Sequence, residues 1–275
     1  MNNTPFLLNH DLHIHSQLSA CSADPEQTTA RLLQYAEDNG FTDICLTDHY
    51  WDEDVPGASK WYAPQNTSHL LEALPLPQSD RVRFHFGCET EMDMHCTIGL
   101  SEKKMEMFDF IIIPTTHLHM AGFTIDGSAD AAERADAWIK RLDNVLNRDL
   151  PFEKIGIAHL TCSLIANKCP FSHTDILRLI SDETMRELFS LAAKRKVGIE
   201  LNFNVAKWDE ETLAETFRPY LIAKECGCKF YMGSDAHHPA NLDAAKENFR
   251  QIAERLELTE ADRFHLPKGN AGQVC

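Results

Sequence analysis

Short, continuous apolar stretches alternate along the chain with longer segments in which apolar residues recur every three or four positions. The short stretches are typical of buried strands, and the longer segments are typical of amphipathic helices. About seven strands are predicted in this way, and they end at or cover residues 11–15, 42–47, 82–86, 108–114, 155–158, 197–201 and 229–232. Strands that alternate with helices in this manner predict a parallel α/β fold.

Helices are predicted in the segments between these strands. The first should begin with Asp24 as its N-cap and Pro25 at its first position, and Asn39-Gly40 should end it. Further helices are predicted at residues 70–74, 128–147, 209–226 and 241–256 and after Asp182, and residues 50–66 are predicted to form a long loop. Because 275 residues suit one large domain, we expect a single domain over residues 1–275.

Most of the predicted strands end on a histidine, an aspartate or a glutamate. In a parallel α/β barrel the C-terminal ends of the strands converge on one face, where active sites lie. Side chains that are far apart in the sequence should therefore gather at one place. The residues concerned are His13, His15, His49, Glu89, His117, His159, Asp235 and His237.

The local spacing of these residues also favours metal binding. In His13-x-His15 and Asp235-x-His237 the two side chains point to the same side of an extended chain, so each pair can bind one ion or two neighbouring ions. A mixed set of imidazoles and carboxylates suits Zn²⁺, Mn²⁺ or Fe²⁺ better than Mg²⁺ or Ca²⁺. Since Glu89 or Asp235 can bridge two ions, the set is large enough for more than one.

The charge of the chain limits which partners it can bind. The chain has 42 acidic and 26 basic residues, a formal charge of −16, which repels polyanions, so we do not expect extended nucleic acid as a partner. A small phosphorylated substrate remains compatible with this charge if the site carries its own cations.

The 9 cysteines are scattered along the chain and indicate reduced thiols. With no secretory signal and no apolar run of the roughly 20 residues that a membrane span needs, we expect a cytoplasmic protein.

Six motifs in this order resemble the PHP (polymerase and histidinol phosphatase) family across nearly the whole chain. They are DLHIH at 11–15, TDH at 47–49, GCE at 87–89, His117, AH at 158–159 and GSDAH at 233–237. The resemblance implies a distorted (β/α)7 barrel like a TIM barrel, phosphoesterase activity and a trinuclear metal site, and we expect two or three divalent ions (Zn, Mn or Fe). The ligands it implies are His13, His15, His49, Glu89, His117, His159, Asp235 and His237.

One position departs from the family pattern. Some members have a further histidine six residues after the His-x-His motif, and Cys21 stands there in this chain. A thiolate can bind a soft metal ion, but the turn that follows gives Cys21 a packing role, which we favour. Asp48 is expected to orient a ligand rather than to bind an ion itself.

The function expected from this set is hydrolysis of a small phosphomonoester, a histidinol-phosphate-like compound or another phosphorylated metabolite. Metal ions lower the pKa of bound water to about 7, and the hydroxide attacks phosphorus. Asp235, His237 and Glu89 are the candidate catalytic residues. His119, Asn202 and His238 are candidate substrate contacts, and Lys60, Lys168 and Lys207 are candidate phosphate-binding cations. Glu91, Asp93 and His95 follow Glu89 in a polar-alternating stretch and are expected in a loop or at a strand edge rather than as metal ligands. The histidines expected at the surface are His10, His69, His85, His173 and His265.

Two alternatives remain open. The same site could act on the phosphodiesters of nucleotides or short oligonucleotides, which the charge of −16 disfavours. The chain could instead be a metal-binding accessory module without turnover, which the nearly complete ligand set disfavours. The sequence does not determine the oligomeric state.

Overall fold

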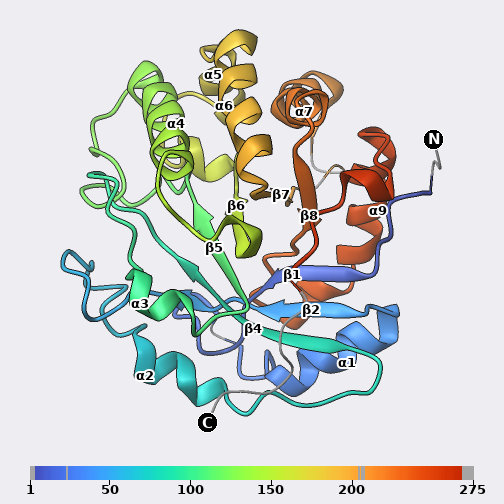
Figure 1. Cartoon of the computed structure of the whole chain (residues 1–275). Helices are drawn as coiled ribbons and strands as arrows, with labels where there is room; N and C mark the ends of the chain where they lie inside the picture. Colours follow the sequence, from blue (N-terminus) through green and yellow to red (C-terminus); the bar gives the residue numbers. More distant parts are fainter. Residues whose placement is uncertain (1–3, 23, 204, 206–207, 268–275) are drawn as a thin grey trace.

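Parallel strands form a nearly closed ring at the centre of the molecule in this computed structural model, which describes residues 4–22, 24–203, 205 and 208–267 (Figure 1). The strand order is β1-β2-β4-β5-β6-β7-β8, and every pair along it is parallel. The strands are β1 (His10–Ile14), β2 (Asp43–Leu46), β4 (Arg83–Thr90), β5 (Phe110–Pro114), β6 (Ile155–Ala158), β7 (Gly198–Leu201) and β8 (Lys229–Met232). A two-residue strand, β3 (His49–Tyr50), also pairs with β4.

The two ends of the sheet meet where β1 approaches the segment after β8. Ile14 forms a parallel bridge with Ala236. The Asp235 amide donates to the His13 carbonyl at 2.7 Å, and the His15 amide donates to the Ala236 carbonyl at 3.1 Å. The predicted distorted (β/α)7 barrel is therefore confirmed.

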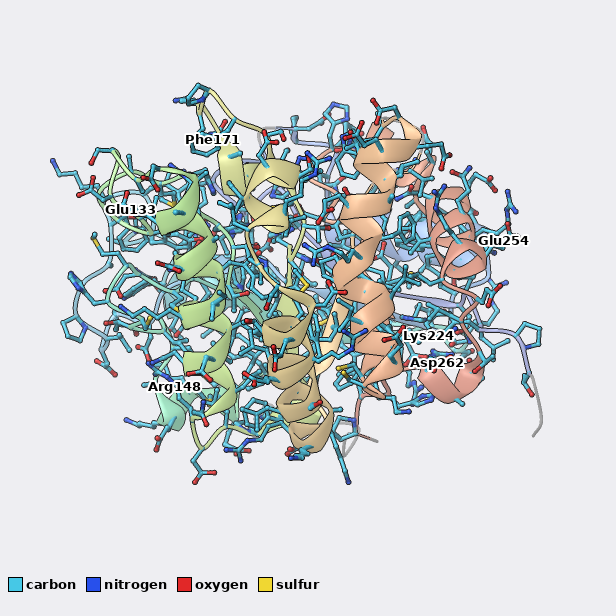
Figure 2. All side chains as sticks on the ribbon, turned by 90° about the horizontal axis from the view of Figure 1, so that it is seen from above. Glu133, Arg148, Phe171, Lys224, Glu254 and Asp262 are labelled. Carbon is cyan, nitrogen blue, oxygen red and sulfur yellow. The ribbon has the colours of Figure 1, made fainter. Side chains whose placement is uncertain are left out.

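Helices surround the ring on its outer side (Figure 1). They are α1 (Thr29–Asn39), α2 (Thr67–Leu70), α3 (Glu102–Met105), α4 (Ala131–Leu146), α5 (His173–Arg178), α6 (Asp182–Arg195), α7 (Glu210–Glu225), α8 (Pro239–Leu242) and α9 (Ala245–Arg255). Helix α6 packs between α4 and α7, and Figure 2 shows these three side by side. No helix of the described part of the chain is long and apolar enough to cross a membrane.

Helix α1 begins later than the sequence predicts. Its N-cap is Thr28, whose hydroxyl accepts from a backbone amide of the first turn, so the prediction of Asp24 as N-cap is wrong. The Gln27 side chain explains the delay, because it is buried and donates to the carbonyls of His15 and Ala236 at 3.0 and 3.1 Å. Residues just before Thr28 are thereby attached to the closing point of the barrel. The helix ends at Gly40 in the left-handed conformation, as predicted.

The strand alternation separates two apolar clusters. The larger one lies between the strands and the helices, and a smaller one includes Cys45, Phe110 and Tyr231 on the inner face of the barrel. In β7, Ile199 belongs to the outer cluster, as does Leu201. Successive side chains of a strand point to opposite faces of the sheet. Glu200, which lies between these two residues, therefore points into the barrel.

Two histidines expected at the surface are buried. His10 is 1% exposed, and its Nε2 accepts a hydrogen bond from the Met232 amide at 3.1 Å. Burial lowers the pKa of His10 to about 3, so the ring is neutral. His173 is also buried, with Nε2 3.2 Å from the Thr216 hydroxyl. The sequence does not indicate their burial, because the neighbours of His10 are Asn9 and Asp11 and those of His173 are Ser172 and Thr174, all polar. His265 is exposed as expected.

Candidate metal centre

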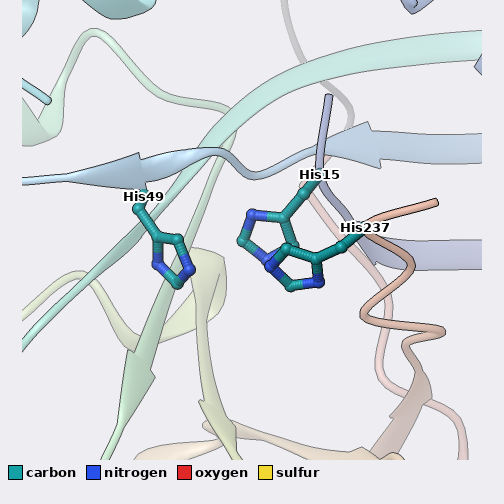
Figure 3. Close-up of side chains that lie close together, drawn as sticks. All are labelled: His15, His49 and His237. Carbon is teal, nitrogen blue, oxygen red and sulfur yellow. The ribbon is translucent and has the colours of Figure 1, made fainter. Parts of the chain in front are cut away.

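The eight residues predicted as ligands lie together at the C-terminal ends of the strands. They come from, or directly follow, β1, β3, β4, β5, β6 and β8. Figure 3 shows three of the rings next to one another: the ring of His15 stacks on that of His237 with centroids 4.0 Å apart and lies 4.5 Å from that of His49. Six of the eight are buried, while the side chains of Asp235 and His237 are 27% and 25% exposed.

Glu89 lies at the centre of the cluster and has no exposed surface. Its Oε2 is 3.0 Å from His49 Nδ1 and 3.4 Å from His15 Nε2. Its Oε1 is 3.3 Å from His159 Nε2 and 3.8 Å from His117 Nε2. Among the described residues, neither oxygen has a hydrogen-bond partner. A buried carboxylate that faces two separate sets of ring nitrogens is suited to bridging two cations.

Asp235 completes the cluster on its more open side. Its Oδ1 lies 3.2 Å from His15 Nε2 and 3.5 Å from His13 Nε2, and its Oδ2 lies 3.8 Å from His159 Nε2. Asp235 and His159 both have positive φ angles, 52° and 64°. Such angles are uncommon for residues other than glycine and occur preferentially at functional sites.

The donor set fits divalent transition-metal ions. Among the described residues, overlapping groups each bring ligand atoms within 4.8 Å of one another. The groups are His15, His49 and His237; His13, His15, Glu89 and Asp235; His13, His159 and Glu200; and Glu89, His117 and His159. Imidazole nitrogens mixed with carboxylate oxygens are ligands of Zn²⁺, Mn²⁺ and Fe²⁺.

Glu200 of β7 lies behind two of the rings. One of its oxygens contacts His13 Nδ1, and the other accepts from the His159 amide at 3.1 Å and lies 3.8 Å from His159 Nδ1. A carboxylate at Nδ1 fixes the ring orientation and leaves Nε2 directed at the centre of the cluster. Gly233 makes room for it, because a Cβ atom there would overlap Glu200 Oε1 and lie 2.6 Å from His13 Cβ.

Glu91 has the corresponding position behind His117. Its Oε2 lies 2.9 Å from His117 Nδ1, and the Tyr62 hydroxyl donates to the same oxygen at 3.3 Å. Arg141, buried on α4, donates to Glu91 Oε1 at 3.3 Å and to the Met92 carbonyl at 2.8 Å. Burial raises the pKa of Glu91 to about 7, and the guanidinium of Arg141 opposes this rise.

Asp48 acts on His15 through an intermediate hydroxyl. The Ser19 hydroxyl donates to Asp48 Oδ1 at 2.7 Å and lies 2.8 Å from His15 Nδ1. The Ser16 amide also donates to Asp48 Oδ1, at 2.7 Å. This position is compatible with the orienting role predicted for Asp48.

Opposing charges dominate the electrostatics of the buried cluster. Burial alone would raise the pKa of Glu89, but the charges of His49 and His13 outweigh it and hold that pKa well below its ordinary value. Burial favours neutral imidazole, yet the carboxylates of Glu200 and Glu89 raise the pKa of His13 well above its ordinary value, and Glu200 with Asp235 raises that of His159 to about 9. These protons would compete with a cation for the same nitrogens.

A cavity of about 760 Å³ opens beside the cluster. Its lining includes His49, Glu89, His117, Asp235 and His237 of the cluster, together with the predicted substrate contact His119 and the candidate cation Lys60. The volume lies within the range of small-molecule sites, about 300–1,000 Å³.

The other predicted substrate contacts are not brought to this cavity. His238 Nε2 is 2.6 Å from Asp24 Oδ2, and its Nδ1 accepts from the Ala240 amide at 3.1 Å as the N-cap of α8. Asn202 is half-buried and Lys168 is exposed, and the described lining includes neither of them. Lys207 lies outside the described residues.

Cys21 is exposed and contributes to the cavity lining, so the packing role favoured for it is wrong. The Ser22 hydroxyl donates to the His237 carbonyl at 2.7 Å and holds this turn against the cluster. Although the residue is exposed as a whole, partial desolvation of its sulfur and the negative charges of Glu89 and Asp235 raise the pKa of Cys21 to about 12, which keeps the thiol protonated.

Glu200, Glu91 and Arg141 were not singled out from the sequence. At the end of β7 the sequence points to Asn202 as a residue of the pocket, but a glutamate between two outward-facing apolar residues of a strand, as Glu200 is, indicates an inward carboxylate. Glu91 was interpreted as part of a loop or strand edge, and only its spacing of two from Glu89 suggested otherwise. Arg141 lies on the buried face of α4, where a charge needs a partner.

The fold and the cluster define a parallel α/β barrel protein with histidines and carboxylates gathered at the C-terminal ends of its strands. The PHP domain model matches residues 11–257, and the chain belongs to the PHP domain family. A probable histidinol-phosphatase of Deinococcus radiodurans is 28% identical over 262 residues, which cover 86% of this chain and 91% of that relative.

A similar fold occurs in histidinol phosphate phosphatase from Lactococcus lactis, whose crystal structure contains zinc, L-histidinol and phosphate. The two chains superpose with a TM-score of 0.64 at 17% identity, over 94% of this chain and 98% of that one. At this identity the likeness concerns the fold.

Proposed function

We propose that this chain is a metal-dependent phosphatase that hydrolyses small phosphomonoesters in the cavity beside the histidine–carboxylate cluster. The observation that carries the proposal is Glu89, a buried carboxylate whose two oxygens lack a hydrogen-bond partner in the described part of the chain and face separate sets of imidazole nitrogens. Membership of the PHP domain family and the relatives named as phosphatases support the same class of reaction.

The ligand groups assign the residues that would hold the ions. The first would lie among His13, His15, Glu89 and Asp235, the second among Glu89, His117 and His159, and a third among His15, His49 and His237. When bound, such ions lower the pKa of a coordinated water to about 7 and offset the charge of the phosphoryl oxygens. Glu89 keeps the first two groups together because each uses a different one of its oxygens.

Two residues of the cluster are suited to move protons. Asp235 and His237 line the cavity, and their side chains are 27% and 25% exposed, whereas Glu89 is inaccessible. We propose that Asp235 or His237 accepts a proton from the attacking water and transfers it to the leaving alcohol. Glu89 would instead connect the first and second ligand groups, to both of which it belongs.

Lys60 is the basic side chain that we assign to the phosphate. It is the one lysine or arginine among the described residues that line the cavity, and it directly precedes Trp61, whose ring centroid is 5.0 Å from that of His49. An ammonium group there attracts a phosphomonoester dianion into a chain whose overall charge is −16.

Histidinol phosphate is the first substrate to test, because both relatives are named for its hydrolysis. The purified chain should be assayed against phosphomonoesters, histidinol phosphate among them, and against phosphodiesters, with Mn²⁺ and Zn²⁺ added separately. We expect metal-dependent release of inorganic phosphate from monoesters and little turnover of diesters. No release from any monoester with either ion would refute the proposal.

A further inference from the structure

Part of the cavity lining is apolar and accessible. Trp61, Met120, Phe123 and Leu164, together called the apolar wall, are each half-buried and line the cavity. They come from three separate segments, which follow β3, β5 and β6. Partly exposed apolar side chains that converge from separate loops on one cavity are typical of ligand sites.

The apolar wall begins directly at the histidine–carboxylate cluster. The ring of Trp61 meets that of His49 edge to face, with centroids 5.0 Å apart. Met120 and Phe123 follow His117 in the same segment. A phosphoryl group held at the cluster would therefore place the organic part of its ester against this wall.

Buried aromatic rings support the wall from behind. Tyr62 is 1% exposed and packs against Trp61 at 4.7 Å and against Phe123 at 5.9 Å between ring centroids. Trp51, also 1% exposed, packs against Phe123 at 5.5 Å. Because these contacts hold the rings in place, less conformational entropy is lost when a ligand binds.

The charges around the wall leave little for a polar group to pair with. Among the described lining residues, the carboxylates are Glu89 and Asp235, both of the cluster, and the lysine is Lys60. The other polar side chains of the described lining, outside the cluster, are those of Cys21, Ser59, Tyr62 and His119, so the several hydroxyl groups of a sugar phosphate would find few partners against the wall.

We propose that the apolar wall binds the organic part of the substrate, and that the substrate class is phosphomonoesters with a planar aromatic or compact apolar group a few bonds from phosphorus. This inference rests on the proposed function, since the cluster must hold the phosphoryl group. It assigns to Trp61, Met120 and Phe123 the role of specificity determinants.

Binding of two non-hydrolysable phosphonates tests the inference without turnover. Methylphosphonate and benzylphosphonate are titrated calorimetrically into the Mn²⁺-loaded full chain. We expect benzylphosphonate to bind at least about tenfold more tightly, because its ring buries apolar surface. Trp61→Ala should reduce this affinity ratio severalfold, and so should the milder Met120→Ala. Trp208→Ala is the matched control, because Trp208 packs on His173 and Phe203 away from the cavity, and it should keep the wild-type ratio.

The outcomes separate the inference from the proposed function. Equal affinities for the two phosphonates, or a ratio that neither Trp61→Ala nor Met120→Ala lowers, would overturn the apolar wall as a binding surface while phosphoryl binding stands. Failure of both phosphonates to bind the metal-loaded chain would overturn the proposed function, and the inference with it.

Discussion

At the scale of single residues, three of the proposed ligand histidines are held from the side that faces away from Glu89. The Nδ1 atom of His13 contacts Glu200, that of His15 lies 2.8 Å from the Ser19 hydroxyl, and that of His117 lies 2.9 Å from Glu91. Each contact leaves the Nε2 atom directed at the centre of the cluster. The side chains behind the rings therefore set the geometry on which the proposed ions depend.

Glu200→Gln should weaken metal binding by about 10- to 100-fold, because an amide keeps the size of the carboxylate but not its charge at His13 and His159. The measurement is activity as a function of Mn²⁺ concentration. A positioning role predicts that high Mn²⁺ restores much of the activity. Glu187→Gln, at an exposed glutamate of α6, is the control and should follow the wild-type curve. An unshifted metal dependence in Glu200→Gln would contradict the assignment.

Lys60→Gln should raise KM for a phosphomonoester by about tenfold with a smaller effect on kcat, because a charge-assisted contact to phosphate is lost. Lys168→Gln is the matched comparison, since Lys168 is exposed and does not belong to the described lining of the cavity. Steady-state kinetics of both variants separate the two candidates. A larger increase in KM for Lys168→Gln than for Lys60→Gln would reverse their assignment.

At the scale of elements, the closing point between β1 and β8 connects the fold to the site. At this point backbone hydrogen bonds join His13 to Asp235 and His15 to Ala236. Glu200 of β7 is packed against Gly233 next to it. A change in the backbone here therefore affects barrel stability and the cluster together.

Gly233→Ala should cost about 1–3 kcal/mol of unfolding free energy, the usual range for overpacking, because the new Cβ overlaps the Glu200 carboxylate and lies 2.6 Å from His13 Cβ. Metal content should fall as well. Denaturant unfolding and metal analysis check both effects, with Gly127→Ala in an exposed loop as the control. Wild-type stability and metal content in Gly233→Ala would mean that this close packing is unimportant.

His10 on β1 makes the same closing point sensitive to acid. Its pKa is about 3 in the folded chain against an ordinary 6.5, so it contributes stability above pH 6.5 that is lost as the pH falls toward 3. The slope for one proton is about 1.4 kcal/mol per pH unit. His10→Gln keeps an acceptor for the Met232 amide and cannot take up the proton. Its unfolding free energy should therefore fall less steeply between pH 6 and pH 4.

The exposed His265→Gln is the control for this comparison and should keep the wild-type pH dependence. If His10→Gln had the same slope as the wild type, His10 would not be a source of acid sensitivity.

At the scale of the whole molecule, the barrel explains what the sequence could predict. Strands end at one face whatever their order, so the pattern of histidines and carboxylates after apolar stretches predicted the gathering of residues as distant as His13 and His237. The alternation of apolar stretches with amphipathic segments likewise predicted that the strands are parallel. It holds no information about pairs such as His13 and Glu200, because their contact depends on the register between strands that are far apart in the chain.

Tertiary contacts also overrode local signals. Asp24 and Pro25 match a helix start, but the buried Gln27 side chain holds this segment and Thr28 becomes the cap. Cys21 resembles a small packing residue in sequence, yet the turn after β1 exposes it in the cavity. In both cases the deciding contact comes from the segment after β8, which local patterns do not reveal.

The central claim of the proposed function is that one cluster binds the divalent ions on which hydrolysis depends. A single titration tests this most directly: metal-free chain receives Mn²⁺ in steps, and bound ions per chain and phosphomonoester hydrolysis are measured on the same samples. The account predicts that two or three ions bind and that activity, absent from the metal-free chain, rises with them. Binding of less than one ion per chain, or full activity before any Mn²⁺ is added, would contradict it.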